Sequence, residues 1–426
     1  MNQRRGRNGV RRAAGVLLAG LLLASGCAAP DDDGAAPGAT DRAVRAVLDR
    51  RAAAVLDHDP AAYLATTDPG ATGLRTAQRR ELDNLADVPL SSWTYRLREV
   101  TARGTERATA EVELRYRIKG YDAAPVTSDR VLDLRRDRAD GRWYVVGDRA
   151  GADQVRQLWE QGDVRVVHGK HSLVLGVGRT EQELRALAGT ADRAVPAVSR
   201  AWPERWAGRV VVLVPRTVED MAGLLGSAAA DYRGIAAVTT GRTGSAGRNP
   251  ADRVIVNPQA YGTLSPLGQR VVLTHETTHV ATRTRTSAAT PTWLSEGFAD
   301  RVAYRAEDRT PAQIAPGLAE AVRRGDPPAG LPTDEDFGFA GDPERLAKAY
   351  EGGWAACALI ADHWGEEKLS AFYRAVGGHP GRDGAVRQAM REVLDTTPRE
   401  FTALWREWLR SRLGQDLPYR PGRTGR

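Results

Sequence analysis

The sequence predicts an α+β protein with two domains, and three observations lead to this prediction. The chain has 426 residues, which is long for a single core and suits two domains of moderate size. Residues 41–150 show apolar positions at helical spacing and then a change to strand-like alternation. Residues 160–415 have the opposite order, with apolar strands first and a long helical half afterwards. Each of the two parts therefore holds enough apolar sequence for a core of its own.

The first 26 residues have the pattern of an export signal. Five arginines and no acidic residue precede an uncharged apolar run at residues 13–23, which is shorter than the roughly 20 residues of a spanning helix. Small residues then lead to Cys27. This arrangement resembles a bacterial lipoprotein signal. The resemblance implies that Cys27 is lipidated and anchors the protein on the outer face of the cell membrane. A plain secretory signal is the alternative.

Composition limits the classes of partner. The formal charge of +7 falls to +2 once the five arginines of the signal are removed, and a nearly neutral chain argues against a nucleic-acid partner. The second cysteine, Cys357, lies in an apolar helical run and is expected to pack in a core. Residues 27–40 are rich in Ala, Pro, Asp and Gly and are expected to form a flexible tether, and residues 416–426 a disordered tail. We expect a monomer.

Residues 41–150 are expected to form a cone in which helices cover an antiparallel sheet. Apolar spacing predicts one helix that starts at Thr40 and has apolar positions as far as Leu56, and a short one around Leu82. Alternation then predicts four strands, at residues 93–97, 108–118, 130–134 and 142–146. This order resembles the cystatin-like, nuclear-transport-factor-2-like superfamily. We interpret the cone as a spacer or binding module because it shows no obvious acid/base pair.

The second domain is expected to begin near residue 160. Strands are predicted within residues 164–177 and at residues 209–214, 234–240 and 253–256, with a helix at residues 180–200. After residue 264 strand signals stop, and helices are predicted to about residue 413.

The residues that carry chemistry begin on one predicted helix, which starts at Ser265-Pro266. His275 and His279 are four residues apart, so both side chains lie on one helical face and both can bind one ion at about 2.0–2.1 Å. Glu276 is about a third of a turn away, where it can reach a water at the ion without binding the ion itself.

A second helix is predicted to open around Pro291, and it offers two carboxylates on one face, Glu296 and Asp300. If this helix packs against the first, Glu296 can complete a three-ligand site that keeps a fourth position open for water. Asp300 is then placed to accept the remaining ring N–H of a metal-binding histidine.

These motifs together resemble the gluzincin metallopeptidases, both thermolysin-like and membrane-alanyl-aminopeptidase-like. The resemblance rests on His275-Glu276-x-x-His279 and on Glu296, which follows after sixteen intervening residues within the segment Trp-Leu-Ser-Glu296-Gly-Phe-Ala. It implies a peptidase domain with a mixed sheet and a helical half, a Zn²⁺ cofactor, and a peptide or protein substrate. It further implies that Glu276 is the general base and that Tyr350, in Ala-Tyr-Glu-Gly-Gly-Trp-Ala, stabilises the oxyanion.

One departure from the family concerns substrate specificity. Membrane-alanyl aminopeptidases carry a Gly-x-Met-Glu-Asn strand that binds the free amine of the substrate, whereas the comparable segment here, residues 234–240, has no glutamate. We therefore expect endopeptidase or unusual exopeptidase activity, with an extended peptide added to this edge strand. Two alternatives stay open: a catalytically inactive zinc-binding envelope module, and a ligand-binding role for the cone. Polar groups that converge inside the cone would favour the latter.

Overall fold

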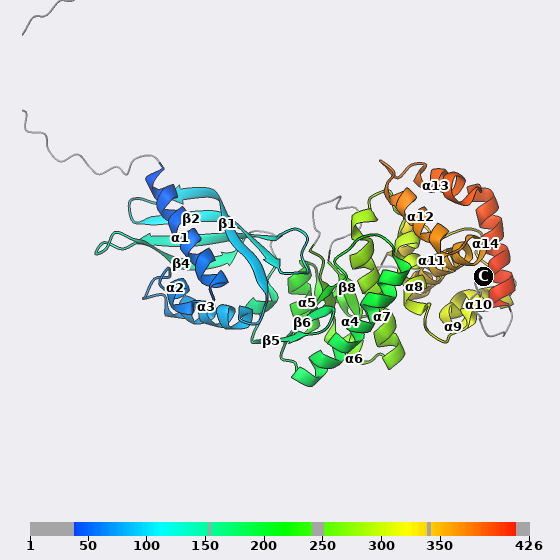
Figure 1. Ribbon diagram of the computed structural model, residues 1–426, viewed down its shortest axis with the longest axis horizontal. Helices are drawn as coiled ribbons and strands as arrows, with labels where there is room; N and C mark the ends of the chain where they lie inside the picture. The colour runs from blue at the N-terminus through cyan, green and yellow to red at the C-terminus, as the bar shows by residue number, and fades with distance from the viewer. Residues whose placement is uncertain (1–37, 152–154, 241–250, 339–341, 415–426) are drawn as a thin grey trace, which may run out of the picture.

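The computed structural model describes residues 38–151, 155–240, 251–338 and 342–414 (Figure 1). Cys27, the expected signal and almost all of the expected tether and tail lie outside these residues. An antiparallel sheet with its helices lies at one end of the molecule, a second sheet in the middle and a helical half at the other end. Within the described ranges, no helix combines the length and the apolar character needed to cross a membrane.

The N-terminal unit, residues 38–151, contains the predicted antiparallel sheet. Its strand order is β1-β2-β3-β4, and every neighbouring pair is antiparallel. The strands are β1 (Leu90–Ala102), β2 (Arg107–Ile118), β3 (Val126–Arg136) and β4 (Trp143–Ala150), and the helices are α1 (Ala39–Leu56), α2 (Pro60–Leu64) and α3 (Thr72–Leu85). Alternate residues of β2 are buried, as the period of two requires. The sequence did not predict helix α2, because it spans little more than a single turn. Asp59 caps this helix by accepting a hydrogen bond from the Ala62 amide.

The second sheet is mixed, as predicted, and has the order β5-β6-β7-β9-β8. Its strands are β5 (Val164–His168), β6 (Ser172–Val177), β7 (Val210–Val214), β8 (Ala237–Thr239) and β9 (Val254–Val256). Strands β6, β7 and β9 are parallel, and α4 (Glu181–Ala201) connects β6 to β7. Strand β8 runs antiparallel to β9 at the edge of the sheet, where the sequence placed it.

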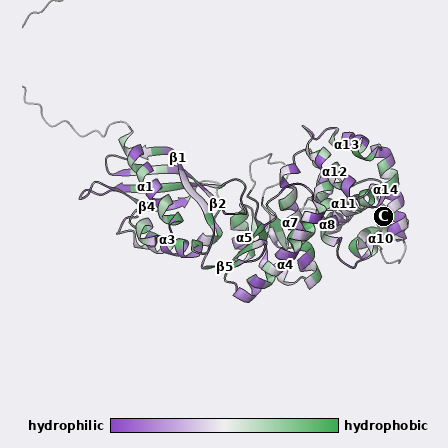
Figure 2. Cartoon of the chain, viewed as in Figure 1, coloured by the Kyte–Doolittle hydropathy of each residue, from purple (hydrophilic) through white to green (hydrophobic). Residues whose placement is uncertain are grey.

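The remaining regular elements of the described residues are helices, and those after residue 264 form the predicted helical half. They are α5 (Val218–Leu225), α6 (Pro258–Gly262), α7 (Pro266–Thr282), α8 (Thr292–Tyr304), α9 (Pro311–Ile314), α10 (Pro316–Arg323), α11 (Pro343–Trp364), α12 (Glu366–Gly377), α13 (Ala385–Leu394) and α14 (Pro398–Leu413). Figure 2 shows hydrophobic and hydrophilic residues interleaved along these helices, as expected when one face of each is buried. Cys357 is fully buried in their core, as predicted.

The N-terminal unit and the second sheet share one apolar core. Trp93 and Tyr116 on the first sheet pack against Trp159, in the segment between the sheets, with ring centroids 5.2–6.2 Å apart. The same cluster continues to Leu173 and Leu175 on β6. The N-terminal unit is therefore packed directly onto the sheet of the second domain.

Two glycines allow α8 and α11 to approach closely. A Cβ atom at Gly297 would lie 2.2 Å from the carbonyl oxygen of Gly353, and one at Gly353 would lie 2.6 Å from that of Trp293. Real side chains do not tolerate such contacts, so both positions require glycine. The close approach brings α11, which carries Tyr350, to the helix that carries Glu296.

Candidate metal centre and catalytic site

Helix α7 begins as the sequence predicts. Ser265 caps it by accepting from the Gly268 amide at 3.2 Å, and Pro266 occupies the first turn, where its missing N–H costs no hydrogen bond. Helix α8 packs directly against α7. Together the two helices supply every candidate metal ligand.

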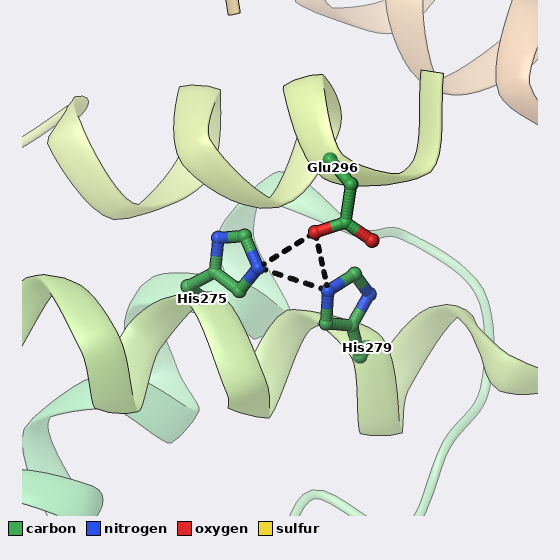
Figure 3. A group of neighbouring side chains, drawn as sticks. All are labelled: His275, His279 and Glu296. Atoms are coloured by element: carbon green, nitrogen blue, oxygen red, sulfur yellow. Dashed lines mark hydrogen bonds and ion pairs between the residues drawn. The ribbon is translucent and has the colours of Figure 1, made fainter. Parts of the chain in front are cut away.

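Three side chains of α7 and α8 point toward one another, as Figure 3 shows for His275, His279 and Glu296. The two Nε2 atoms are 2.9 Å apart, and Glu296 Oε2 is 3.1 Å from His275 Nε2 and 3.4 Å from His279 Nε2. Ligands held about 2.0–2.1 Å from a tetrahedral zinc ion lie roughly 3.3–3.4 Å from one another. The triangle is therefore slightly smaller than the base of such a site, and its donor set of two imidazoles and one carboxylate fits zinc.

Asp300 fixes the orientation of His275. Its Oδ1 atom lies 2.8 Å from His275 Nδ1, so that ring nitrogen donates its proton to the carboxylate and Nε2 is left to face the centre. Burial lowers the pKa of His275, but the nearby charges of Asp300 and Glu296 outweigh burial and raise the pKa well above its usual value. The structure thus brings Asp300 to His275, and its role behind a metal ligand stays a prediction.

The Glu296 carboxylate is held in its charged form. Burial raises its pKa, but the imidazoles of His279 and His275 lower the pKa far more, to well below its usual range. A metal cation would displace the second imidazole proton, and the cluster would then offer it one full negative charge and two neutral nitrogen ligands.

Glu276 is buried and does not join the three ligand atoms. Its Oε2 atom lies 2.7 Å from the Thr239 hydroxyl on the edge strand β8, and the same hydroxyl is 3.0 Å from the Glu276 carbonyl oxygen. Burial raises the pKa of Glu276, against the opposing effects of His275 and His279. Sequence reasoning predicted the edge strand but missed Thr239, because nothing in the sequence pairs residue 239 with residue 276.

Tyr350 lies at the same centre. Its ring is 6.4 Å from the His275 ring, centroid to centroid, and it packs edge-on against Phe337 at 5.2 Å. Burial raises the pKa of its hydroxyl well above the usual value, and the carboxylates of Glu296 and Asp300 raise the pKa further. The hydroxyl is therefore protonated at neutral pH and can donate a hydrogen bond.

Polar groups also converge inside the N-terminal unit. The buried Arg51 guanidinium donates to the Tyr63 hydroxyl at 2.7 Å and to Asp148 at 3.2 Å. Arg130 donates to Asp148 at 2.7 Å and to Glu160 at 2.5 Å. These guanidinium groups are bound by carboxylates and hydroxyls of neighbouring elements. We interpret the cluster as part of the folded core, and the metal centre is the stronger candidate for chemistry.

The contact between His275 and Asp300 leads to a prediction about metal affinity. Asp300→Asn removes the charge that orients His275 and makes it a better ligand, so zinc should bind about 10–100-fold more weakly. Competition with a chelator measures this affinity. Asp308→Asn, at an exposed position just after α8, is the matched control and should leave it unchanged. Equal affinities for the Asp300 variant and the parent protein would contradict the assignment.

Comparison with known proteins gives no family. No family model matches the chain, and no curated protein matches it. A SEC-C motif containing protein from Rhodopseudomonas palustris is 24% identical over 23% of this chain and 71% of that one, with a TM-score of 0.19. Native yeast LTA4 hydrolase is 15% identical over 68% of this chain, with a TM-score of 0.34. The match spans 44% of the yeast enzyme. At these TM-scores neither structure identifies the fold or activity of this chain.

Proposed function

We propose that this protein is a zinc-dependent peptidase. The observation that carries the proposal is the convergence of His275, His279 and Glu296 within 3.4 Å of one another, beside a buried glutamate on the same helix. A bound zinc ion would supply Lewis-acid chemistry there, by lowering the pKa of a water and polarising a carbonyl group. The remaining steps are assigned to the side chains around the centre.

Glu276 acts as the general base and then as the general acid. It takes a proton from the attacking water and delivers that proton to the nitrogen of the departing amine. Thr239 supports this role because its hydroxyl contacts both the carboxylate and the carbonyl of Glu276 and so limits the side chain to one orientation. A binding-only zinc site would need no such buried base, which argues against the inactive alternative.

Tyr350 stabilises the oxyanion. Its protonated hydroxyl donates a hydrogen bond to the carbonyl oxygen as negative charge develops on it. The close approach of α8 and α11 at Gly297 and Gly353 supports this assignment, because it holds Tyr350 beside the ligand helix.

The edge strand β8 is proposed to bind the peptide. It pairs with β9 on one side only, among the residues that the structure describes, so its other side can add an extended segment of substrate. Strand β8 carries no glutamate for a free amine, which favours cleavage within a chain over removal of the first residue.

We further propose that the enzyme is a monomer attached through lipidated Cys27 to the outer face of the cell membrane. Its substrates would be extracytoplasmic peptides or proteins, and no nucleic acid is involved.

Cys27→Ser should move the protein from the membrane fraction to the soluble fraction, since the anchor depends on that thiol. Immunoblots of the two fractions measure this. An unchanged distribution of the protein between the two fractions would contradict the proposed lipid anchor.

Loss of the general base is the direct test of the activity. Glu276→Gln should reduce hydrolysis of a peptide library by about 10²–10⁴-fold while zinc content stays the same, because the amide cannot accept the proton. Mass spectrometry of the digests, with metal analysis of the same samples, measures both. Glu392→Gln, on the exposed face of α13, is the control. Hydrolysis that survives in Glu276→Gln would rule out this mechanism.

A second variant tests the oxyanion contact. Tyr350→Phe should lower kcat by about 10²–10³-fold with little change in KM, because the lost hydrogen bond strengthens only in the transition state. Steady-state kinetics on one responsive peptide measures this. Tyr261→Phe removes a hydroxyl from α6 and should change neither constant. A rise in KM with kcat preserved would show that Tyr350 binds substrate without stabilising the oxyanion.

A further inference from the structure

A buried ion pair joins the N-terminal unit to the second sheet. Asp122 follows β2, and its oxygens lie 2.6 and 2.8 Å from the two terminal nitrogens of Arg253, just before β9. The Asp122 side chain is fully buried, and that of Arg253 is 8% exposed. Asp122 also accepts from the Ile118 amide at 2.7 Å, which fixes it to the end of β2. This is a rigid, desolvated contact and not a surface pair.

The Arg253 backbone holds the edge strand. Its amide donates to the Thr240 hydroxyl at 2.8 Å, and the Thr240 amide donates back to the Arg253 carbonyl at the same distance. Thr240 directly follows Thr239, whose hydroxyl contacts Glu276. Two adjacent residues of the edge strand thus make the contact with the proposed base and the contact with Arg253.

The neighbouring residue, Asp252, holds the end of helix α7. Its Oδ2 atom lies 2.8 Å from Arg283 Nε, and the same guanidinium donates to the Thr240 carbonyl at 3.0 Å. Arg283 is four residues after His279, one helical turn beyond the second proposed ligand. The segment around Arg253 therefore contacts both the edge strand and the metal-binding helix.

We propose that Asp122 is a positioning residue for the catalytic site: from the N-terminal unit it holds Arg253, and through Arg253 the relative placement of β8 and α7. The catalytic part of this inference rests on the proposed peptidase function. The structural part does not rest on that function, because the contacts link the three segments even if the site hydrolyses no peptide. Removing the carboxylate leaves a buried guanidinium without its counter-charge, so the Arg253 segment must shift.

The test compares Asp122→Asn with Asp148→Asn in the full-length protein. Asp148 is a matched control, because it is also a buried aspartate paired with arginines of the N-terminal unit but does not contact the second sheet. Three quantities are measured: hydrogen exchange by mass spectrometry, zinc affinity by chelator competition, and kcat and KM for a responsive peptide. Asp122→Glu, which keeps a carboxylate, is measured beside them.

The expected result is localised. Asp122→Asn should increase exchange in peptides that cover residues 237–240, 252–257 and the end of α7, which are called the cleft peptides below. It should weaken zinc affinity and lower kcat, each by about 2–30-fold, the range for changes along packed contact networks. Asp122→Glu should keep exchange in these peptides and zinc affinity near the parental values, because it retains the carboxylate. Asp148→Asn should increase exchange only within the N-terminal unit.

Two outcomes would overturn the proposal: unchanged exchange in the cleft peptides of Asp122→Asn, or equal changes in those peptides for Asp122→Asn and Asp148→Asn. If Asp122→Asn fails to fold, Asp122→Glu decides the question. Parental exchange in the cleft peptides and parental zinc affinity in Asp122→Glu would support the requirement for a carboxylate. Altered cleft exchange in that variant despite its carboxylate contradicts it. If the parent protein hydrolyses no peptide, the exchange pattern still decides the positioning role, so failure of the proposed function is recognised separately.

Discussion

The convergence of His275, His279 and Glu296 is the constraint on which the rest of the site depends. Three polar atoms within 3.4 Å of one another in a mostly buried place need compensation for the water they have lost. Neighbouring groups supply it. Asp300 accepts a hydrogen bond from the Nδ1–H of His275, and the two imidazoles keep Glu296 charged. A divalent cation at the centre would complete this balance, which is why the cluster is better explained as a metal site than as part of a core.

Packing of three helices and one short strand produces this convergence. The ligands come from α7 and α8, Tyr350 comes from α11, and Thr239 comes from the edge of the sheet. Gly297 and Gly353 allow two of the helices to approach closely enough that no side chain fits between them. The catalytic assignment thus depends on backbone distances that larger residues at these positions would not permit.

Much of this arrangement could be predicted from the sequence, because its main signals are local. The spacing of His275 and His279 follows from helical geometry, and Ser265-Pro266 defines the start of their helix. Asp300 was predictable because it shares a face with Glu296. The contacts of Thr239 with Glu276 and of Asp122 with Arg253 could not be predicted from the sequence. They join residues 37 and 131 positions apart, and no periodicity links such partners.

The N-terminal unit has a different place in the molecule from the one its sequence indicated. Its predicted strands are present, and the shared core around Trp159 and the pair between Asp122 and Arg253 connect it to the domain that carries the candidate metal centre. Its buried Arg51 and Arg130 both pair with Asp148, and Arg130 also pairs with Glu160 in the segment between the two sheets. The unit is therefore joined to that domain by both an apolar core and a buried ion pair.

X-ray absorption at the zinc edge, on protein purified without added metal, tests the central claim most directly. The account predicts about one zinc ion per chain, with two imidazole nitrogens at about 2.0–2.1 Å and oxygen ligands at about 2.0–2.2 Å. His279→Ala should remove one imidazole from that spectrum. A zinc-free protein that also fails to take up added zinc, or a spectrum unchanged in His279→Ala, would contradict the account.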